Sequence, residues 1–310
     1  MQLFVQNRRA IATLLAFLAG FIGLNSCSSL RNEVSPSLLG ATSTKLVVTC
    51  YLSPQDTILA VKVTRSNTVV GDSISLLQTG NNVTDATVTL SDGSRTVVLT
   101  YNRIVAGDTV KSRPYYSADI RSLPIVVDGT YTLHVTTPNG QIATSRCTIP
   151  AAVPLKEVKL DSINQRYYLQ ANWQDPANQV NYYQVSGSLR YILTSCVSCK
   201  TESASGLSFE DDNRGLFSDS GVDGTVIPSG RAYLNINPSV KFHNQFRKAR
   251  VILNLLSVDQ SYFLFQDAIN RQRRSRNNPF AEPVLIPSNI DGGLGCFAGY
   301  NTTSKTLTIK

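Results

Sequence analysis

The chain of 310 residues is 42% hydrophobic, 8% aromatic and only 16% charged, whereas globular proteins usually carry about 25% charged residues. Together with the many Thr, Ser and Val residues, this composition excludes a coiled coil, a long-helix protein and a highly charged disordered chain. The formal net charge is +8, and a mean hydropathy of −0.06 without repeated long apolar runs excludes a multi-span membrane protein. A chain of this length is expected to form two domains.

Residues 1–26 are predicted to be an export signal. Arg8 and Arg9 form a positively charged segment, and an apolar run of 14 residues, 11–24, follows them. This run is too short to span a bilayer comfortably, but its length suits the hydrophobic part of a signal peptide.

The end of the apolar run, Leu24-Asn25-Ser26-Cys27, resembles a bacterial lipobox. In a lipobox the cysteine thiol is alkylated with lipid, and cleavage before the cysteine then frees its amine for acylation. Several acyl chains, each worth about 0.8 kcal/mol per buried CH₂, anchor a protein far more firmly than one chain does. We therefore expect Cys27 to be lipidated and to bind a lipid bilayer. An ordinary secreted protein with an incidental Cys27 is the alternative.

Residues 27–44 are predicted to form a lipidated, flexible tether, because they are small and polar and have no period of 2 or 3.6. No acidic run follows Cys27. In the Bacteroidetes-type lipoproteins that this leader resembles, such a run tends to mark export to the cell surface. The expected location is therefore the cell envelope, anchored in the outer membrane on its periplasmic face, and this compartment excludes nucleic acid as a partner.

Short runs of β-branched or alternating residues recur over residues 45–150, with no helical pattern among them. Asn139-Gly140, between two alternating runs, is the strongest hairpin signal in the chain. Turn residues at Asp92-Gly93 and Asp128-Gly129 separate other runs. About seven strands at this spacing predict an immunoglobulin-like β-sandwich over residues 45–150, which a stiff, proline-containing linker at 150–154 ends.

Residues 155–310 are predicted to form a second β-rich domain with one amphipathic helix near 258–274, so the expected fold class is mainly all-β. Trp173, the only tryptophan, alternates with apolar neighbours and is expected to anchor a core rather than to form a ligand platform. The helix is expected to begin at a capping box that starts at Ser257. Arginines at 271–276 close it and suit the negative end of the helix dipole. An acidic partner, such as lipopolysaccharide phosphate, is the alternative role for these arginines.

Five cysteines remain after Cys27, so at least one thiol is expected to stay free or to pair between chains. Export permits disulfides. Cys50 and Cys147 lie in the first and last strands of the predicted sandwich, and we expect them to pair if these strands are neighbours. The flanks of Cys196-Val-Ser-Cys199 favour neither a thioredoxin-like site nor a structural zinc site. A local disulfide between Cys196 and Cys199, or two inert thiols, is the prediction.

The sequence contains no recognisable catalytic constellation. Its two histidines, His134 and His243, are far apart, and it has no Walker loop, nucleophile elbow or His-Glu-x-x-His motif. Residues 210–224 are rich in the oxygen ligands that Ca²⁺ prefers, but no EF-hand register fits them. We therefore expect no catalytic residue, metal or cofactor, and a solvated loop at 210–224. A calcium site of another kind is the alternative.

Residues 288–300 are unusually rich in glycine, which indicates positive φ or close backbone approach. The motif Asn289-Ile290-x-Gly292-Gly293-Leu294-Gly295-x-Phe297 resembles that of a large Bacteroidetes lipoprotein family known as DUF4249. The resemblance covers nearly the whole mature chain, and it extends to Leu46-Val47-Val48, Trp173-Gln174-Asp175-Pro176, Asp223-Gly224 and residues 278–284. Cys296 departs from it, because a small or aliphatic residue is more familiar there. The resemblance implies an envelope lipoprotein, often encoded beside a TonB-dependent receptor, and it implies no reaction.

These features predict a non-catalytic envelope lipoprotein that serves a TonB-dependent outer-membrane receptor as an accessory or ligand-binding partner. The first alternative is a surface adhesin or glycan-binding module, with Tyr115, Tyr116, Tyr182 and Tyr183 as candidate ligand contacts. The second alternative is an envelope hydrolase of an unrecognised type, which would need a deep polar pocket with clustered carboxylates.

Overall fold

The computed structural model describes residues 44–66, 81–102, 114–163, 166–210, 214–234, 236, 241–275, 280–282 and 284–309. The predicted export signal, Cys27 and all of the predicted tether except Thr44 lie outside the described residues. The described chain is mainly β, as the sequence predicts. No helix in these ranges is long and apolar enough to cross a membrane.

The N-terminal part is built from antiparallel strands in the order β1-β2-β5-β4-β3-β6-β7. A short 3-10 helix, η3 (Ile120–Ser122), follows β5. The expected hairpin at Asn139-Gly140 is confirmed, because β6 and β7 pair across it. The strands are β1 (Leu46–Leu52), β2 (Ile58–Arg65), β3 (Thr87–Ser91), β4 (Thr96–Tyr101), β5 (Tyr116–Asp119), β6 (Thr130–Thr136) and β7 (Ile142–Thr148).

Alternating burial along these strands creates the first hydrophobic core. In β1, Leu46, Val48, Cys50 and Leu52 are at most 1% exposed, and the residues between them are less buried. Successive side chains of a strand point to opposite faces, so one face of each strand contributes to this core. The core also takes residues from β2, β3, β6 and β7, which is the arrangement of a β-sandwich.

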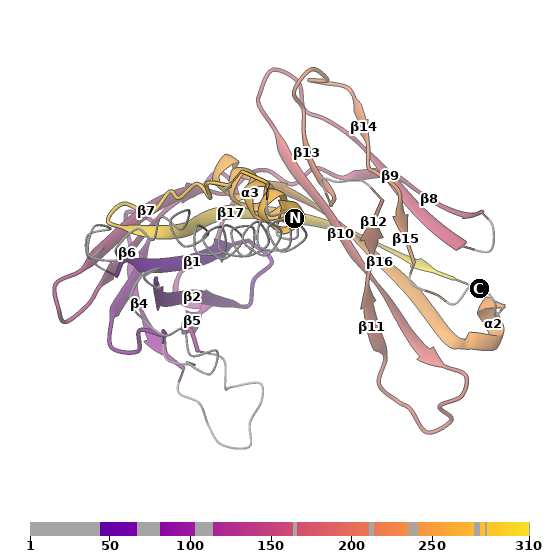
Figure 1. Ribbon diagram of the computed structural model, residues 1–310, viewed down its shortest axis with the longest axis horizontal. Coiled ribbons are helices and arrows are strands. Elements are labelled where there is room, and N and C mark those ends of the chain that lie inside the picture. The colour runs from indigo at the N-terminus through magenta and orange to yellow at the C-terminus, as the bar shows by residue number, and fades with distance from the viewer. Residues whose placement is uncertain are drawn as a thin grey trace, which may run out of the picture. The chain divides into compact units, whose positions relative to one another are not determined.

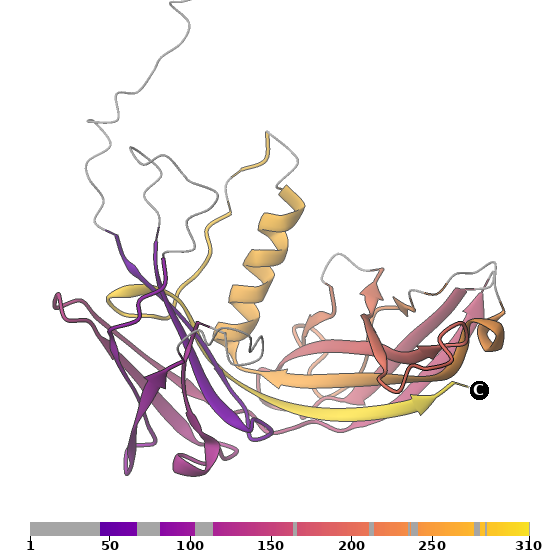
Figure 2. The same ribbon diagram turned by 90° about the horizontal axis from the view of Figure 1, so that it is seen from below.

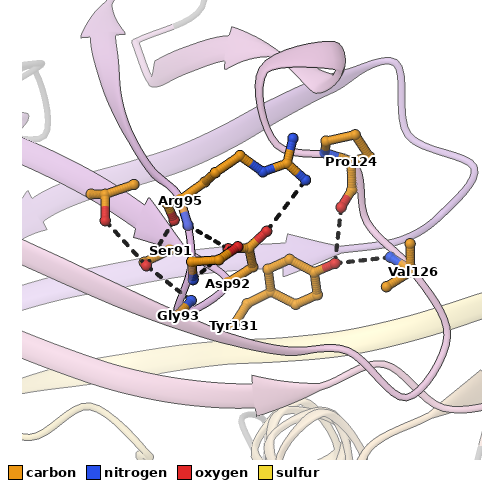
Figure 3. Close-up of polar contacts among 9 residues, drawn as sticks. Ser91, Asp92, Gly93, Arg95, Pro124, Val126 and Tyr131 are labelled. Carbon is orange, nitrogen blue, oxygen red and sulfur yellow. Dashed lines mark hydrogen bonds and ion pairs between the residues drawn. The ribbon is translucent and has the colours of Figure 1, made fainter.

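Polar contacts at two turns hold this sandwich in register (Figure 3). The Oη of Tyr131 in β6 donates to the carbonyl oxygen of Pro124 (2.9 Å) and accepts from the backbone N of Val126 (2.9 Å). Immunoglobulin-like sandwiches have a tyrosine corner of this kind. Asp92 closes the β3–β4 turn by accepting from the backbone N of Arg95 (2.7 Å), which confirms the turn predicted there.

The last strand, β17 (Gly293–Thr308), returns to the N-terminal part. It pairs in parallel with β1 and antiparallel with β16 (Phe246–Val258). Ile290 and Phe297 lie in the same hydrophobic core as β1. The sequence predicts a separate domain over the whole of 155–310, whereas in the structure the glycine-rich tail packs into the N-terminal sandwich. Local periodicity does not reveal which strand a tail will pair with.

The rest of the described chain forms a second sandwich-like arrangement. β10 and β16 lie side by side along most of their length (Figure 1), and β11 and β13 also pair with β10. A smaller sheet contains β12, β15, β9 and β14 in that order, with β8 on β9. The further elements are β8 (Leu155–Ile163), β9 (Arg166–Gln174), β10 (Tyr182–Leu193), β11 (Ser203–Gly206), β12 (Ser208–Phe209), β13 (Leu216–Ser218), β14 (Val226–Pro228), β15 (Ala232–Tyr233), α2 (Phe242–Gln245) and α3 (Gln260–Ser275).

Trp173 stands in the second hydrophobic core, which β9, β10 and β16 line. Its side chain is 0% exposed, and its ring centroid lies 5.2 Å from that of Tyr183 and 5.6 Å from that of Phe217. A buried aromatic cluster of this size contributes strongly to core packing. The prediction that Trp173 anchors a core is confirmed.

The predicted helix is α3, seen as one continuous helix in Figure 2. Its cap differs from the expectation. Ser257 is still in β16, where its Oγ accepts from the backbone N of Val153 (3.2 Å). Asp259 caps the helix by accepting from the N of Tyr262 (2.8 Å), and it also accepts from the N of Gly299 in β17 (2.8 Å). Burial raises the pKa of Asp259. One carboxylate thus ties the start of α3 to the returning strand.

Candidate functional site

The glycine-rich tail is a structural closure. The backbone of Gly295 has φ +119°, and a Cβ there would lie 1.9 Å from the carbonyl oxygen of Val48. Gly292 has φ +76°, and a Cβ there would lie 2.3 Å from the carbonyl oxygen of Ile142. Only glycine allows the backbone of the tail to approach β1 and β7 so closely. The close approach inferred from the sequence is therefore confirmed.

Asn289 extends this closure with its side chain. Its Nδ2 donates to the carbonyl oxygen of Phe297 (2.6 Å), and its Oδ1 accepts from the N of Phe297 (2.9 Å). The amide group therefore satisfies both backbone groups of a residue that is 0% exposed. Ser145 Oγ donates to the carbonyl oxygen of Asn289 (2.6 Å) and fixes the tail to β7. The most distinctive sequence motif thus holds the fold together.

Of the two predicted pairings of cysteines, the local one is present. Cys196 and Cys199 form a disulfide with an S–S distance of 2.03 Å. The expected Cys50–Cys147 bridge is wrong, because both residues are buried free thiols. Cys50 lies opposite Val61 and Phe297, and the strand order keeps β1 away from β7 as a hydrogen-bonded neighbour.

The buried thiols are also expected to be unreactive. Cys296, the third of them, has its sulfur 3.7 Å from the carbonyl oxygen of Ser261. Burial is the largest influence on all three thiols: it raises the pKa values of Cys50 and Cys147, and it raises the pKa of Cys296 to about 12. Because the thiolate is the reactive form, these cysteines are suited to packing rather than to nucleophilic or redox chemistry.

The four candidate tyrosines divide into two pairs. Tyr116 and Tyr183 are only 2% and 1% exposed, so the expectation that they contact a ligand is wrong. Each belongs to a pair of adjacent tyrosines, Tyr115-Tyr116 or Tyr182-Tyr183. Because adjacent side chains of a strand point to opposite faces, one member of each pair faces the core. Tyr115 is half-buried and lines a cavity of about 390 Å³. Tyr182 is half-buried and packs against the ring of Phe263 at a centroid distance of 4.8 Å.

Three carboxylates gather where β9, β10 and the 219–224 turn meet. Oxygens of Asp175, Asp219 and Asp223 all lie within 4.8 Å of one another. Carboxylate oxygens are ligands that Ca²⁺ accepts. Asp175 and Asp219 are only 2% and 4% exposed, so Asp219 is not in a solvated loop as expected. The neighbouring residues Asp211, Asp212 and Asn213 lie outside the described residues.

Protein donors also engage these carboxylates. Asp175 accepts from Tyr183 Oη (2.5 Å) and from the N of Gly224 (2.9 Å). Asp219 accepts from the N of Asn181 (2.7 Å). Burial, followed by the contact with Asp175, raises the pKa of Tyr183. The cluster therefore joins β9 to the turn before β10. Asp175 belongs to this cluster although the acidic pattern at 210–224 does not include it.

Three basic residues of β16 form contacts within the fold. Glu202 pairs with Lys248 (3.3 Å) and Arg250 (2.8 Å). Together these contacts lower the pKa of Glu202, with the Arg250 hydrogen bond as the main cause. Arg247 donates to the carbonyl oxygens of Val197 (3.3 Å) and Cys199 (2.8 Å) and so holds the disulfide loop.

A polar cavity of about 510 Å³ lies beside β10, and two of its lining residues, Leu207 and Phe209, also pack against the second core. Gln184 and Ser186 of β10 line it, together with Gln266 and Arg273 of α3 and with Arg214 before β13. Cavities of about 300–1,000 Å³ hold small molecules in many proteins. The sequence does not predict this site, because its residues come from segments that are far apart along the chain.

Comparison with known proteins identifies the family. The model of a family described as "Domain of unknown function (DUF4249)" matches residues 31–306. The chain belongs to the DUF4249 family. A search of curated proteins gave no match.

Two solved structures show only weak likeness to this DUF4249 chain. One is a DUF4785 family protein from Legionella pneumophila, with 12% identity and a TM-score of 0.24, covering 70% of this chain and 54% of the Legionella protein. The other is a protein from Bacteroides uniformis that is itself only proposed to bind carbohydrate. It has 11% identity and a TM-score of 0.21, covering 70% of this chain and 91% of that protein.

Proposed function

We propose that this DUF4249 chain is a non-catalytic cell-envelope lipoprotein that acts as an accessory or ligand-binding partner of a TonB-dependent outer-membrane receptor. The observation that carries the proposal is Leu24-Asn25-Ser26-Cys27 directly after the apolar run. An acylated Cys27 anchors the folded part to the outer membrane, on the periplasmic face. The receptor is proposed because the family that the tail motif resembles is often encoded beside a TonB-dependent receptor.

The roles of the unusual residues support a non-catalytic function. The tail glycines and Asn289 close the sandwich, and the free thiols are buried. The three clustered aspartates accept hydrogen bonds from the surrounding backbone or from Tyr183. The adhesin alternative is less well supported, because two of its four tyrosines are buried.

Lipidation is tested by labelling cells with radioactive palmitate and by fractionating their membranes. We expect the wild-type chain to incorporate label and to sediment with outer membranes, and Cys27→Ala to do neither. Cys296→Ala is the matched control, since it removes a buried free cysteine that lies far from Cys27 in the sequence. Equal labelling and fractionation of Cys27→Ala and wild type would show that the anchor is wrong.

The receptor partnership is tested by cross-linking intact cells and purifying the lipidated chain from solubilised outer membranes. We expect a TonB-dependent receptor to be recovered with it, and to be lost with Cys27→Ala because that variant leaves the membrane. Recovery of the lipidated chain without any such receptor would refute this part of the proposal and would leave the anchor unaffected.

A further inference from the structure

The cavity over β10 is polar because of strand alternation. Tyr183 and Val185 point into the second core and are each 1% exposed. Gln184 and Ser186, between and after them, line the cavity on the opposite face. Tyr262 Oη of α3 donates to Gln184 Oε1, which fixes this amide at the base of the helix.

Arg214 reaches the cavity from a strained turn. Its backbone has φ +51°, a left-handed conformation that a long side chain rarely adopts. Gly215 follows with φ +79°, and a Cβ there would lie 2.3 Å from the carbonyl oxygen of Val185. The N of Val185 donates to the carbonyl oxygen of Gly215 (2.7 Å), so β10 holds the turn in place. Strained backbone of this kind is found preferentially at functional sites.

Arg273 approaches from the last turn of α3. Its neighbour on the helix, Arg271, is paired with Asp267 (3.0 Å). By contrast, neither Arg214 nor Arg273 forms an ion pair with any residue that the structure describes. Two guanidinium groups that have no carboxylate partner among the described residues therefore line one cavity. Guanidinium is the side chain best suited to carboxylate, sulfate or phosphate groups.

The remaining lining suits a hydroxyl-rich molecule better than an isolated ion. Gln266 and the buried Asn270 add amide groups from α3, and amides both donate to and accept from hydroxyls. Phe209 and Tyr233 add aromatic rings that are half-buried. The face of a sugar ring is apolar and packs on such rings, while its hydroxyls reach the amides.

We propose that this cavity binds an anionic sugar, a sugar acid or a sugar sulfate, whose charged group lies between Arg214 and Arg273. The inference rests on the ligand-binding part of the proposed function and names the chemistry of its ligand. The ring packs on Phe209 and Tyr233, and its hydroxyls bond to the amides of β10 and α3. The anionic group replaces the carboxylate partner that the two arginines lack among the described residues.

The test is isothermal titration calorimetry on the full lipidated chain in detergent. The probes are glucuronate, galacturonate and glucose 6-sulfate, with glucose and inorganic sulfate as comparators. We expect at least one anionic sugar to bind, more tightly than either comparator, and to bind more weakly as salt increases. Binding of inorganic sulfate alone would show an anion site and would overturn the sugar assignment. No binding of any anionic sugar at millimolar concentration would overturn the whole inference.

Two variants locate the site. Arg214→Asn keeps a residue that tolerates positive φ, and Arg273→Gln keeps a good helix former. Each variant should lower the affinity for the anionic sugar by roughly tenfold or more, because each removes a hydrogen bond to a charged group. Arg271→Gln is the matched control: it removes the same charge from the same helix outside the cavity and should leave the affinity unchanged. Circular dichroism verifies that each variant is folded.

The outcome is separable from that of the proposed function. An equal affinity in Arg214→Asn, Arg273→Gln and wild type would refute the cavity as the site, even if sugars bind elsewhere. If the chain co-purifies with a receptor but binds no anionic sugar, the accessory role stands and the ligand assignment fails. If the chain binds the sugar through these arginines but no receptor is recovered, the ligand assignment stands and the accessory role fails.

Discussion

Replacing Asn289 by alanine tests whether the tail closes the sandwich. The side chain forms two hydrogen bonds with the backbone of Phe297, at 2.6 and 2.9 Å. Alanine removes both partners and leaves an N–H and a carbonyl group unpaired in a residue that is 0% exposed. Each orphaned group costs about 1–3 kcal/mol, so we expect a loss of about 2–6 kcal/mol. That is a large part of a typical unfolding free energy of about 5–15 kcal/mol.

The assay is urea denaturation followed by two signals. Circular dichroism reports the strands of both parts of the described chain, and the fluorescence of Trp173 reports the second core. Asn254→Ala is the control, because its amide oxygen accepts one hydrogen bond from Ser304 Oγ (2.7 Å) at an exposed position. Such a surface change is expected to cost about 0.5 kcal/mol. If Asn289→Ala costs no more than Asn254→Ala, the reasoning about the tail is wrong.

Three more outcomes are expected from the same denaturation measurements. Gly295→Ala should abolish folding or lower the unfolding free energy several times more than Gly93→Ala does, since Gly93 also has positive φ but open space around it. Equal losses of unfolding free energy would refute the close approach of Gly295 to β1. Tyr183→Phe should cost about 1–3 kcal/mol by removing a buried bond to a carboxylate, and Tyr115→Phe, at a half-buried position, should cost less; the reverse order would contradict this. Burial raises the pKa of Cys296 from its ordinary 9.0 to about 12, so its protonated form stabilises the folded state below pH 9 and that contribution is lost as pH rises toward 12. Cys296→Ala should therefore show a smaller fall in unfolding free energy between pH 8 and 11, and an unchanged slope would count against the assignment.

Features that depend on neighbouring residues were predictable from the sequence. The Asn139-Gly140 hairpin, the helix near 258–274 and the burial of Trp173 all follow from periodicity and turn chemistry. The disulfide between Cys196 and Cys199 is one of the two outcomes that the sequence predicts for these residues, since they are close along the chain.

Features that depend on distant partners were not predictable. Nothing local to Cys147 shows that its strand is not a hydrogen-bonded neighbour of the strand of Cys50. Asp175 joins Asp219 and Asp223 only because β9 ends beside their turn. The cavity over β10 similarly needs α3 and the turn at Arg214 to be brought together. A single sequence contains the residues of such sites without the contacts that assemble them.

The parallel pairing of β1 with β17 has a consequence for biogenesis. β1, the first strand of the described residues, can pair with β2 early, but its other border stays unpaired until residues 293–299 have been synthesised and, if the leader acts as proposed, have emerged on the far side of the inner membrane. Pairing over such a long separation along the chain is slow. During that interval the open border of β1 leaves the newborn polypeptide vulnerable to proteases and to aggregation.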